Sequence, residues 1–323
     1  MNKVKVSAPG KLMLLGEHAV VYNHPCLVTA VDQRMKAIVE VLDSPEFQLE
    51  AEDVRVTGYK KPLSDLGKGN IPKGAQFVEI AVKNLNEKYP LKFGLKVMTK
   101  SEFSSKFGFG SSSASTVCTV KAVSEILGLN LSQKEIFDLS YKTVLDIQGK
   151  GSGFDVAAGV FGGTLYFVTG GKVIEHLNIK SLPLVVGYSD AKADTVTLIN
   201  KVKKSFANKQ DRLNEIYSSI EVLVNKAKDA LLKGDLKTFG QLMSTNQKYL
   251  QELGVSIDKL DNMIKAAIDA GAYGAKLSGA GGGDCMIAIA PDDKREEVKR
   301  KIVQAGGEIL DIKANAEGVR IEK

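Results

Sequence analysis

The chain has 323 residues, 44% hydrophobic and 25% charged, which is enough apolar content for about two domains of ordinary size. Its net charge of +6 suits an anionic small-molecule substrate, but the charge is spread along the chain, 38 of the 44 basic residues are lysines and tryptophan is absent, which disfavours a nucleic-acid partner. Cys26, Cys118 and Cys285 are too few and too scattered for a disulfide framework or a cysteine-based zinc site, so we expect them to be buried.

The N-terminus runs at once into a strand-like alternation that begins at Val4. It lacks the apolar core of a signal peptide, and no stretch of the chain approaches the roughly 18 apolar residues of a membrane span. We therefore expect a soluble, cytoplasmic protein with no membrane partner.

The part of the chain before residue 108 mixes strand and helix patterns. Apolar alternation and β-branched residues predict strands at residues 4–8, 13–15, 28–31, 37–42 and 95–98. A helical rhythm at residues 77–85 precedes the last of these strands.

Residues 108–114 read Gly-Phe-Gly-Ser-Ser-Ser-Ala and precede a helix expected at residues 115–127. Glycines let the backbone approach a ligand, serine hydroxyls donate hydrogen bonds, and the free N–H groups at a helix start favour phosphate. The run is neither a Walker loop, since no Gly-Lys pair is followed by Ser or Thr, nor a Rossmann loop, since Ser113 replaces the third glycine. We interpret it as an anion cradle; a flexible linker is the alternative.

A second glycine loop, residues 148–153, follows a helix whose expected start, Ser132 with Glu135, is a capping-box pattern. The loop leads into Asp155, which opens a short apolar segment before a strand expected at residues 164–168. A carboxylate fixed by the backbone in this way suits a general base for an attacking hydroxyl, but Asp is also a good helix N-cap. The residues alone leave both interpretations open.

The pattern changes near residue 181, and we predict two domains, 1–180 and 181–323. After a strand at residues 184–188, two segments with a 3.6-residue apolar rhythm are separated by Gly234-Asp235, which predicts a helical hairpin. A third glycine cluster, residues 279–283, precedes a strand at 285–290, a charged helix from Asp292 and a last strand at 308–312.

Three polar side chains near the N-terminus are candidates for chemistry. Lys11 precedes the apolar run 12–15, and a lysine that enters the interior needs an anionic partner, for which Asp155 is suited. A surface lysine at a strand end is the alternative. Glu17 and His18 end the same run and either bond a polar substrate or form a satisfied buried pair. Three glycine loops beside such groups indicate a polyanion held from several sides, as phosphoryl transfer requires.

Three ordered motifs resemble those of the GHMP kinases, a family of small-molecule kinases. They are residues 8–22, Ala-Pro-Gly-Lys-Leu-Met-Leu-Leu-Gly-Glu-His-Ala-Val-Val-Tyr, residues 108–114, and residues 276–285, Lys-Leu-Ser-Gly-Ala-Gly-Gly-Gly-Asp-Cys. The resemblance spans nearly the whole chain. It implies an α+β, two-domain GHMP kinase fold, with a ribosomal-protein-like N-terminal domain, a ferredoxin-like C-terminal domain and the active site between them, and it implies ATP and Mg²⁺ as cofactors.

Within the family, residues 17–22 and residues 253–256 are most similar to members that phosphorylate mevalonate, so the implied partners are the small molecules mevalonate and ATP, with a homodimer left open. The resemblance implies Asp155 as the base and Lys11 as its partner. It implies an acceptor site formed by Glu17, His18, Ser152, Gly153 and Thr195. It implies that the ATP phosphates are bound by Gly108, Gly110, Ser111, Ser112, Ser113, Ala114, Gly279, Ala280, Gly281 and Gly282.

Two departures from the mevalonate pattern concern the acceptor and the metal. Residues 151–156 and 283–285 look more like members that act on phosphomevalonate, which is the alternative acceptor, although a negative charge on Glu17 would repel its extra phosphate. The family's usual glutamate ligand for Mg²⁺, eleven residues before the base, is here Val144, which leaves Ser112 as the main ligand and Asp146 as an out-of-register candidate. A catalytically dead ligand sensor of the same family is a further alternative, disfavoured by the presence of Lys11 and Asp155.

Overall fold

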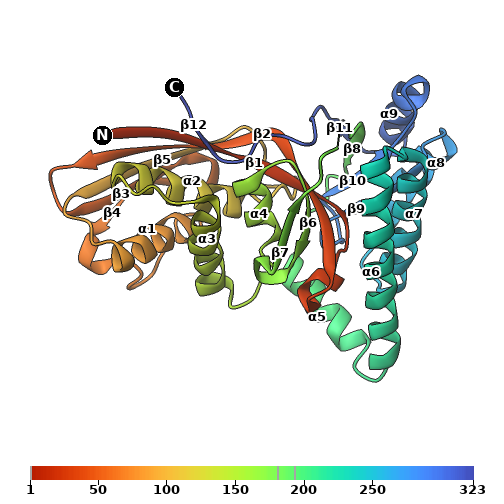
Figure 1. Ribbon diagram of the computed structural model, residues 1–323, viewed down its shortest axis with the longest axis horizontal. Helices are drawn as coiled ribbons and strands as arrows, with labels where there is room; N and C mark the ends of the chain where they lie inside the picture. Colours follow the sequence, from red (N-terminus) through yellow and green to blue (C-terminus); the bar gives the residue numbers. More distant parts are fainter. Residues whose placement is uncertain (1, 180–181, 193) are drawn as a thin grey trace.

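Two β-sheets, each with helices packed on it, organise the molecule (Figure 1). The computed structural model describes residues 2–179, 182–192 and 194–323. The first sheet contains β1 (Lys3–Leu15), β2 (Pro25–Leu42), β3 (Glu46–Ala51), β4 (Val56–Pro62), β5 (Gly94–Ser101), β6 (Thr164–Val168), β7 (Val173–His176) and β12 (Arg320–Ile321). The second contains β8 (Leu184–Tyr188), β9 (Gly274–Ser278), β10 (Cys285–Ile289) and β11 (Glu308–Leu310).

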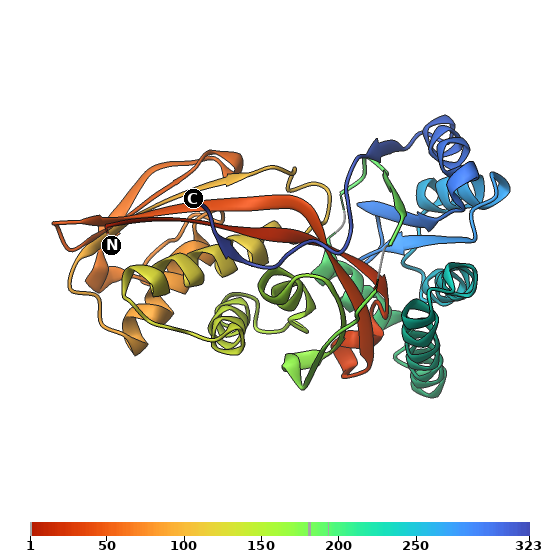
Figure 2. The ribbon, with the colours of Figure 1, turned by 45° about the horizontal axis from the view of Figure 1, so that its top comes forward.

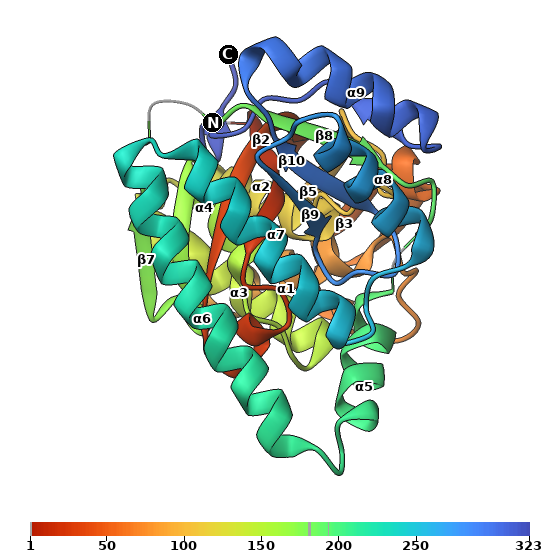
Figure 3. The ribbon, with the colours of Figure 1, turned by 90° about the vertical axis from the view of Figure 1, so that its right-hand side faces the viewer.

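The strand orders are β12-β1-β2-β5-β3-β4 in the first sheet, where β6 also pairs with β2, and β11-β8-β10-β9 in the second. Helices α1 (Gln76–Lys88), α2 (Ser111–Ile126), α3 (Gln133–Gln148) and α4 (Phe154–Phe161) lie on one face of the first sheet, below the strands in Figure 2. The second half of the chain contains α5 (Thr195–Ser205), α6 (Gln210–Lys233), α7 (Leu236–Glu252), α8 (Asp258–Asp269) and α9 (Arg295–Gln304). Figure 3 shows α7, α8 and α9 around the second sheet.

The expected α+β class is confirmed, and several local predictions are confirmed with their causes. The strands at 164–168 and 184–188 have the predicted bounds. Ser132 caps α3 in a full capping box with Glu135. The helical hairpin is α6 and α7, where Gly234 ends α6 in the left-handed conformation with φ 72° and Asp235 accepts a hydrogen bond from Thr238 N at 3.0 Å.

The first two strands are longer than the sequence pattern indicates. Segments 4–8 and 13–15 belong to one strand, β1, and segments 28–31 and 37–42 belong to β2. The β1–β2 pairing shifts register between Pro9 and Gly10, which interrupts the alternation on which the prediction rested. Just beyond this irregularity, Lys11 N donates to Phe109 O, in the loop before α2, at 3.0 Å.

Other predicted bounds are corrected. Helix α2 begins at Ser111, inside the glycine and serine run rather than after it, with Gly110 as its N-cap at φ 77°. Helix α5 was not expected from the sequence, and it starts where Asp194 accepts a hydrogen bond from Thr197 N at 3.1 Å. Strands β3, β4, β7, β9 and β12 were also not expected. Strands β7 and β12 are very short, whereas β3 was missed although its residues alternate between polar and apolar.

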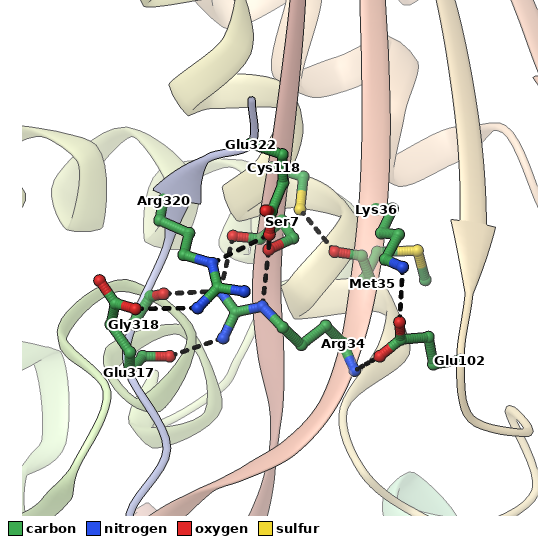
Figure 4. A network of polar contacts seen from close by, with 10 residues as sticks. All are labelled: Ser7, Arg34, Met35, Lys36, Glu102, Cys118, Glu317, Gly318, Arg320 and Glu322. Atoms are coloured by element: carbon green, nitrogen blue, oxygen red, sulfur yellow. Dashed lines mark hydrogen bonds and ion pairs between the residues drawn. The ribbon is translucent and has the colours of Figure 1, made fainter.

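The C-terminal segment returns to the first sheet. Strand β12 pairs with β1, and both chain ends lie on the same half in Figure 1. Figure 4 shows the contact that holds this segment: the buried guanidinium of Arg34 donates to Ser7 Oγ at 2.6 Å and to the carbonyls of Glu317 and Gly318 at 2.8 and 2.7 Å. The last strand therefore connects the second sheet back to β1, which carries Lys11.

All three cysteines are buried and unpaired, as expected. Among the described residues, no helix combines the length and the apolar character that crossing a membrane requires.

Candidate active site

The part of the molecule built on the first sheet is called here the first half, and the part built on the second sheet the second half. A cavity of about 330 Å³ lies between them. Its walls come from the end of β1, the starts of α2 and α4, the first two turns of α5 and the glycine loop between β9 and β10. The three predicted motifs, which are far apart in the sequence, therefore meet at one place. The predicted site residues that line it are Lys11, Glu17, His18, Gly108, Gly110, Ser111, Ser112, Ser113, Ser152, Gly153, Asp155, Thr195, Gly279 and Ala280.

The first turn of α2 faces this cavity. Its leading N–H groups have no carbonyl partner inside the helix, and the helix dipole adds partial positive charge at the same point. Gly108 precedes it at φ 71°, and a Cβ added there would lie 2.6 Å from Asp284 Oδ2, so a larger residue would be both strained and crowded. The start of α2 is thus shaped to receive an anion close to the backbone.

Lys11 enters the cavity from β1. Its side chain is buried, its Nζ donates to Gly108 O at 2.6 Å, and it lies 5.4 Å from the centre of the Phe154 ring. Burial lowers the pKa of Lys11, and the nearby carboxylates of Asp155 and Asp284 oppose that shift. The predicted direct ion pair with Asp155 is corrected, because among the described contacts no Lys11 nitrogen lies within 4.0 Å of that carboxylate; the two interact at longer range.

Asp155 lies in the first turn of α4, after the N-cap Gly153 at φ 89°. Its Oδ2 accepts a hydrogen bond from Ser113 Oγ at 2.6 Å, and its Oδ1 accepts one from Val156 N at 3.1 Å. Ser113 was expected to bind phosphate, but its hydroxyl holds this carboxylate instead. The base candidate is therefore fixed from α2 and placed beside the anion cradle.

Glu17 and His18 occupy the turn after β1. The Glu17 carboxylate forms an ion pair with Lys276, and Asn246 Nδ2 donates to its second oxygen at 3.3 Å. His18 Nε2–H donates to Ala280 O at 2.9 Å, since a carbonyl can only accept. Burial lowers the pKa of His18, so its imidazole is neutral near pH 7, and the bond to Ala280 leaves Nδ1 as an acceptor.

Four predicted site residues lie outside the cavity, and their expected contacts are corrected. The Ala114 N–H bonds Gly110 O at 3.0 Å within α2. Gly281 and Gly282, inside the third glycine loop, lie against Val255, whose carbonyl accepts from Gly282 N at 2.7 Å.

Asp146, the fourth, accepts from Lys142 Nζ at 2.5 Å and Asn84 Nδ2 at 2.8 Å. Two residues make about half a turn of helix, so Val144 faces the cavity and Asp146 points to α1.

Two cavity-lining lysines were missed as site residues. Lys150 lies inside the second glycine loop, where its Nζ donates to Asn200 Oδ1 of α5 at 3.4 Å. Lys192 lies shortly before α5. The position of Lys150 within the second glycine loop was a signal available in the sequence, whereas only the fold brings Lys192 to the cavity.

Comparison with known proteins gives one consistent result. Sequence models described as "GHMP kinases N terminal domain" and "GHMP kinases C terminal" match residues 76–163 and 227–308. The mevalonate kinase of Pyrococcus abyssi is 36% identical to this chain over 99% of its length and 98% of the relative. The chain belongs to the GHMP kinase family.

Solved structures of family members have the same architecture as this GHMP kinase. The Methanococcus jannaschii mevalonate kinase aligns with a TM-score of 0.81 and 28% identity over 96% of this chain and 97% of that chain. The L. major mevalonate kinase in complex with R-mevalonate aligns with a TM-score of 0.80 and 25% identity over 97% of this chain and 96% of that chain. The two-domain fold expected from the motifs is therefore that of the family.

Proposed function

We propose that this GHMP kinase transfers the γ-phosphoryl group of ATP to the C5 hydroxyl of mevalonate, giving 5-phosphomevalonate and ADP. The observation that carries the proposal is the meeting, in one cavity, of a helix N-terminus suited to phosphate, the Asp155 carboxylate and buried Lys11. Full-length relatives named mevalonate kinase, and a solved relative with R-mevalonate bound, support this acceptor.

In the proposed reaction, Asp155 accepts the proton of the acceptor hydroxyl as that oxygen attacks the γ-phosphorus. An O–P bond forms to the acceptor, the bond from the γ-phosphorus to the bridging oxygen breaks, and ADP leaves with the electron pair. The 2.6 Å bond from Ser113 keeps the carboxylate oriented for this transfer. Lys11 supplies a positive charge beside the transferred group, where negative charge shifts during the reaction.

The phosphates of ATP would lie on the start of α2, held by the backbone of residues 108–112 and the hydroxyls of Ser111 and Ser112, with Gly279 and Ala280 approaching from the second half. Mg²⁺ often binds through substrate phosphates, waters and one or two protein oxygens, and the Ser112 hydroxyl fits that mode. Within the described residues, no group of three or more His, Cys, Asp or Glu side chains would hold a metal independently of the nucleotide.

The acceptor would occupy the part of the cavity lined by His18, Ser152, Gly153 and Thr195. The neutral His18 imidazole and the Thr195 hydroxyl suit the hydroxyl groups of mevalonate better than they suit a second phosphate.

Phosphomevalonate is the competing acceptor, and the charge of Glu17 does not disfavour it as the sequence suggested. Lys276 pairs with Glu17, so that carboxylate does not present an isolated negative charge to the cavity. Lys150 and Lys192, which line the cavity, favour an additional anion. Against it, no arginine is among the described residues lining the cavity, and a phosphate dianion is bound best by an arginine fork or several fixed cations.

We expect mevalonate to have the higher kcat/KM of the two acceptors by at least tenfold, about 1.4 kcal/mol in transition-state stabilisation. The measurement is ADP release in a coupled assay at saturating MgATP, with galactose and homoserine as further acceptors and no acceptor as the blank. A higher kcat/KM for phosphomevalonate would overturn the proposed acceptor, and the absence of turnover with every acceptor would support a ligand sensor.

The metal assignment predicts different effects for two substitutions. Ser112→Ala removes a proposed ligand and should raise the Mg²⁺ concentration needed for half-maximal rate at fixed ATP. Asp146→Asn should leave that concentration unchanged, because Asp146 is engaged with Lys142 and Asn84 outside the cavity. If Asp146→Asn raises it and Ser112→Ala does not, the out-of-register carboxylate is the ligand and the assignment is wrong.

A further inference from the structure

A buried ion pair joins the two halves of the molecule behind the proposed acceptor site. Glu17 follows β1 in the first half and is 1% exposed, while Lys276 lies on β9 in the second half and is 0% exposed. Besides Glu17, the Lys276 ammonium donates to the carbonyl of Leu277. Asn246 of α7 donates to the second oxygen of the Glu17 carboxylate at 3.3 Å. Glu17 of the first half is thus bound by two side chains of the second half, those of Lys276 and Asn246.

The end of β1 is also hydrogen-bonded to β9 at a second point. Ser278, two residues after Lys276 on β9, accepts a hydrogen bond from Met13 N at 3.0 Å and donates to Met13 O at 2.9 Å. Met13 is two residues from Lys11 on β1, so both contacts fix the strand that carries the proposed catalytic lysine. The ion pair then fixes the turn that follows.

His18, the next residue, has an unusual backbone that depends on this anchor. Its φ of 60° and ψ of −50° lie outside the regions that a histidine normally adopts, so the surrounding structure must impose them. Glu17 is anchored on one side of this residue, and the bond from His18 Nε2 to Ala280 O fixes the ring on the other. The ring bonds the glycine loop at residues 279–283, to which the proposed function assigns contacts with the ATP phosphates.

We propose that Glu17 is a positioning residue and not a ligand of the acceptor: anchored by Lys276 and Asn246, it holds His18 in the orientation in which His18 binds the acceptor. The effect on binding of mevalonate rests on the proposed function, whereas the effect on the orientation of His18 does not. It differs from the expectation drawn from the motif, in which Glu17 contacts the acceptor itself.

The proposal predicts that the charges of the pair are dispensable when both are removed together. Breaking a buried pair from one side leaves an uncompensated charge, whereas replacing both partners by neutral groups of similar size leaves none. Glu17→Gln/Lys276→Met keeps an oxygen that accepts from Asn246 and an apolar chain in place of the lysine stem. A ligand role predicts the opposite, since the carboxylate would be missing from the acceptor site in the double variant as well.

The experiment compares Glu17→Gln, Lys276→Met and the double variant for KM of mevalonate, KM of MgATP and kcat. We expect Lys276→Met to raise the KM for mevalonate at least ~10-fold. The KM of the double variant should lie within ~3-fold of the wild-type value. This difference between the two variants exceeds the ordinary non-additivity of substitutions at separate sites. A double variant as impaired as Glu17→Gln alone would overturn the proposal. If Lys276→Met does not fold, the comparison of Glu17→Gln with the double variant still decides.

A spectroscopic readout separates this inference from the proposed function. The chain has three histidines, so a His18→Gln variant assigns the His18 ring signals in a long-range ¹H–¹⁵N spectrum. We expect wild type and the double variant to show the Nε2–H tautomer with a pKa below the ordinary value, and Lys276→Met to shift both toward free histidine. Unchanged His18 signals in Lys276→Met would contradict the positioning role even if no acceptor were turned over. Lys265→Met, which breaks an exposed pair with Asp269 on α8, is the control and should change neither readout.

Discussion

Asp155→Asn is expected to lower kcat by about 10²–10⁴-fold, the usual cost of losing a general base. Asparagine keeps the size of the side chain and an oxygen that accepts the hydrogen bond from Ser113, but it cannot take up the proton of the acceptor. The KM for MgATP should barely change, because Asp155 is not among the groups assigned to the phosphates. Steady-state kinetics with both substrates varied gives the two constants.

The matched control is Asp146→Asn, the same change at a carboxylate on α3 outside the cavity, for which kcat should stay at the wild-type value at saturating Mg²⁺. If Asp155→Asn keeps more than about a tenth of kcat, above the range expected for a base, Asp155 only stabilises the start of α4.

Lys11→Met should lower kcat by about 10²–10³-fold, comparable to the loss of a preorganised group that stabilises charge in the transition state. Methionine keeps most of the length of the buried stem and removes the ammonium that lies within electrostatic range of Asp155 and Asp284. Lys3→Met, on the same strand but exposed and paired with Glu40, is the control and should have wild-type kinetics.

The wild-type pH profile tests the same residue. Burial lowers the pKa of Lys11, so its protonated form is lost as the pH rises, at a pH below the ordinary lysine value of 10.5. If the ammonium is required, kcat falls on this alkaline side in wild type. The alkaline fall should be absent from the residual activity of Lys11→Met, and its persistence there would assign it to another group.

Local features of the fold could be predicted because they depend on neighbours within a few residues. Ser132 and Glu135 cap α3 through contacts that span one turn, and Gly234 ends α6 because a left-handed residue is needed there. The strand at 164–168 is a short apolar run bounded by glycines, and it forms as expected. Residue pattern alone is sufficient in each case.

Irregular geometry explains where the prediction of elements failed. The register shift at Pro9 and Gly10 broke the alternation of β1, so one strand was predicted as two. Helix α2 starts three residues after Gly108, inside a run of serines that suggested a loop, and its N-cap is Gly110 in the left-handed conformation.

In the candidate site, too, the sequence predicted some features and missed others. The motifs identified Lys11, Asp155, Gly108 and residues 110–112, all of which line the cavity. The partners of these groups were predicted less well: Ser113 bonds Asp155 where Lys11 was expected, and Lys11 bonds Gly108 O. Such pairings depend on distances of a few ångströms between separate elements, which residue type does not specify.

By itself, then, the sequence determined the family, the α+β class and the three motifs, because helix period, caps and glycine conformations are encoded over a few residues. Only the tertiary structure decided that Glu17 pairs with Lys276, 259 positions away, and that the last strand returns to β1 under Arg34. A buried charge must find an opposite charge or a hydrogen-bond partner, and the strand order decides which one lies next to it.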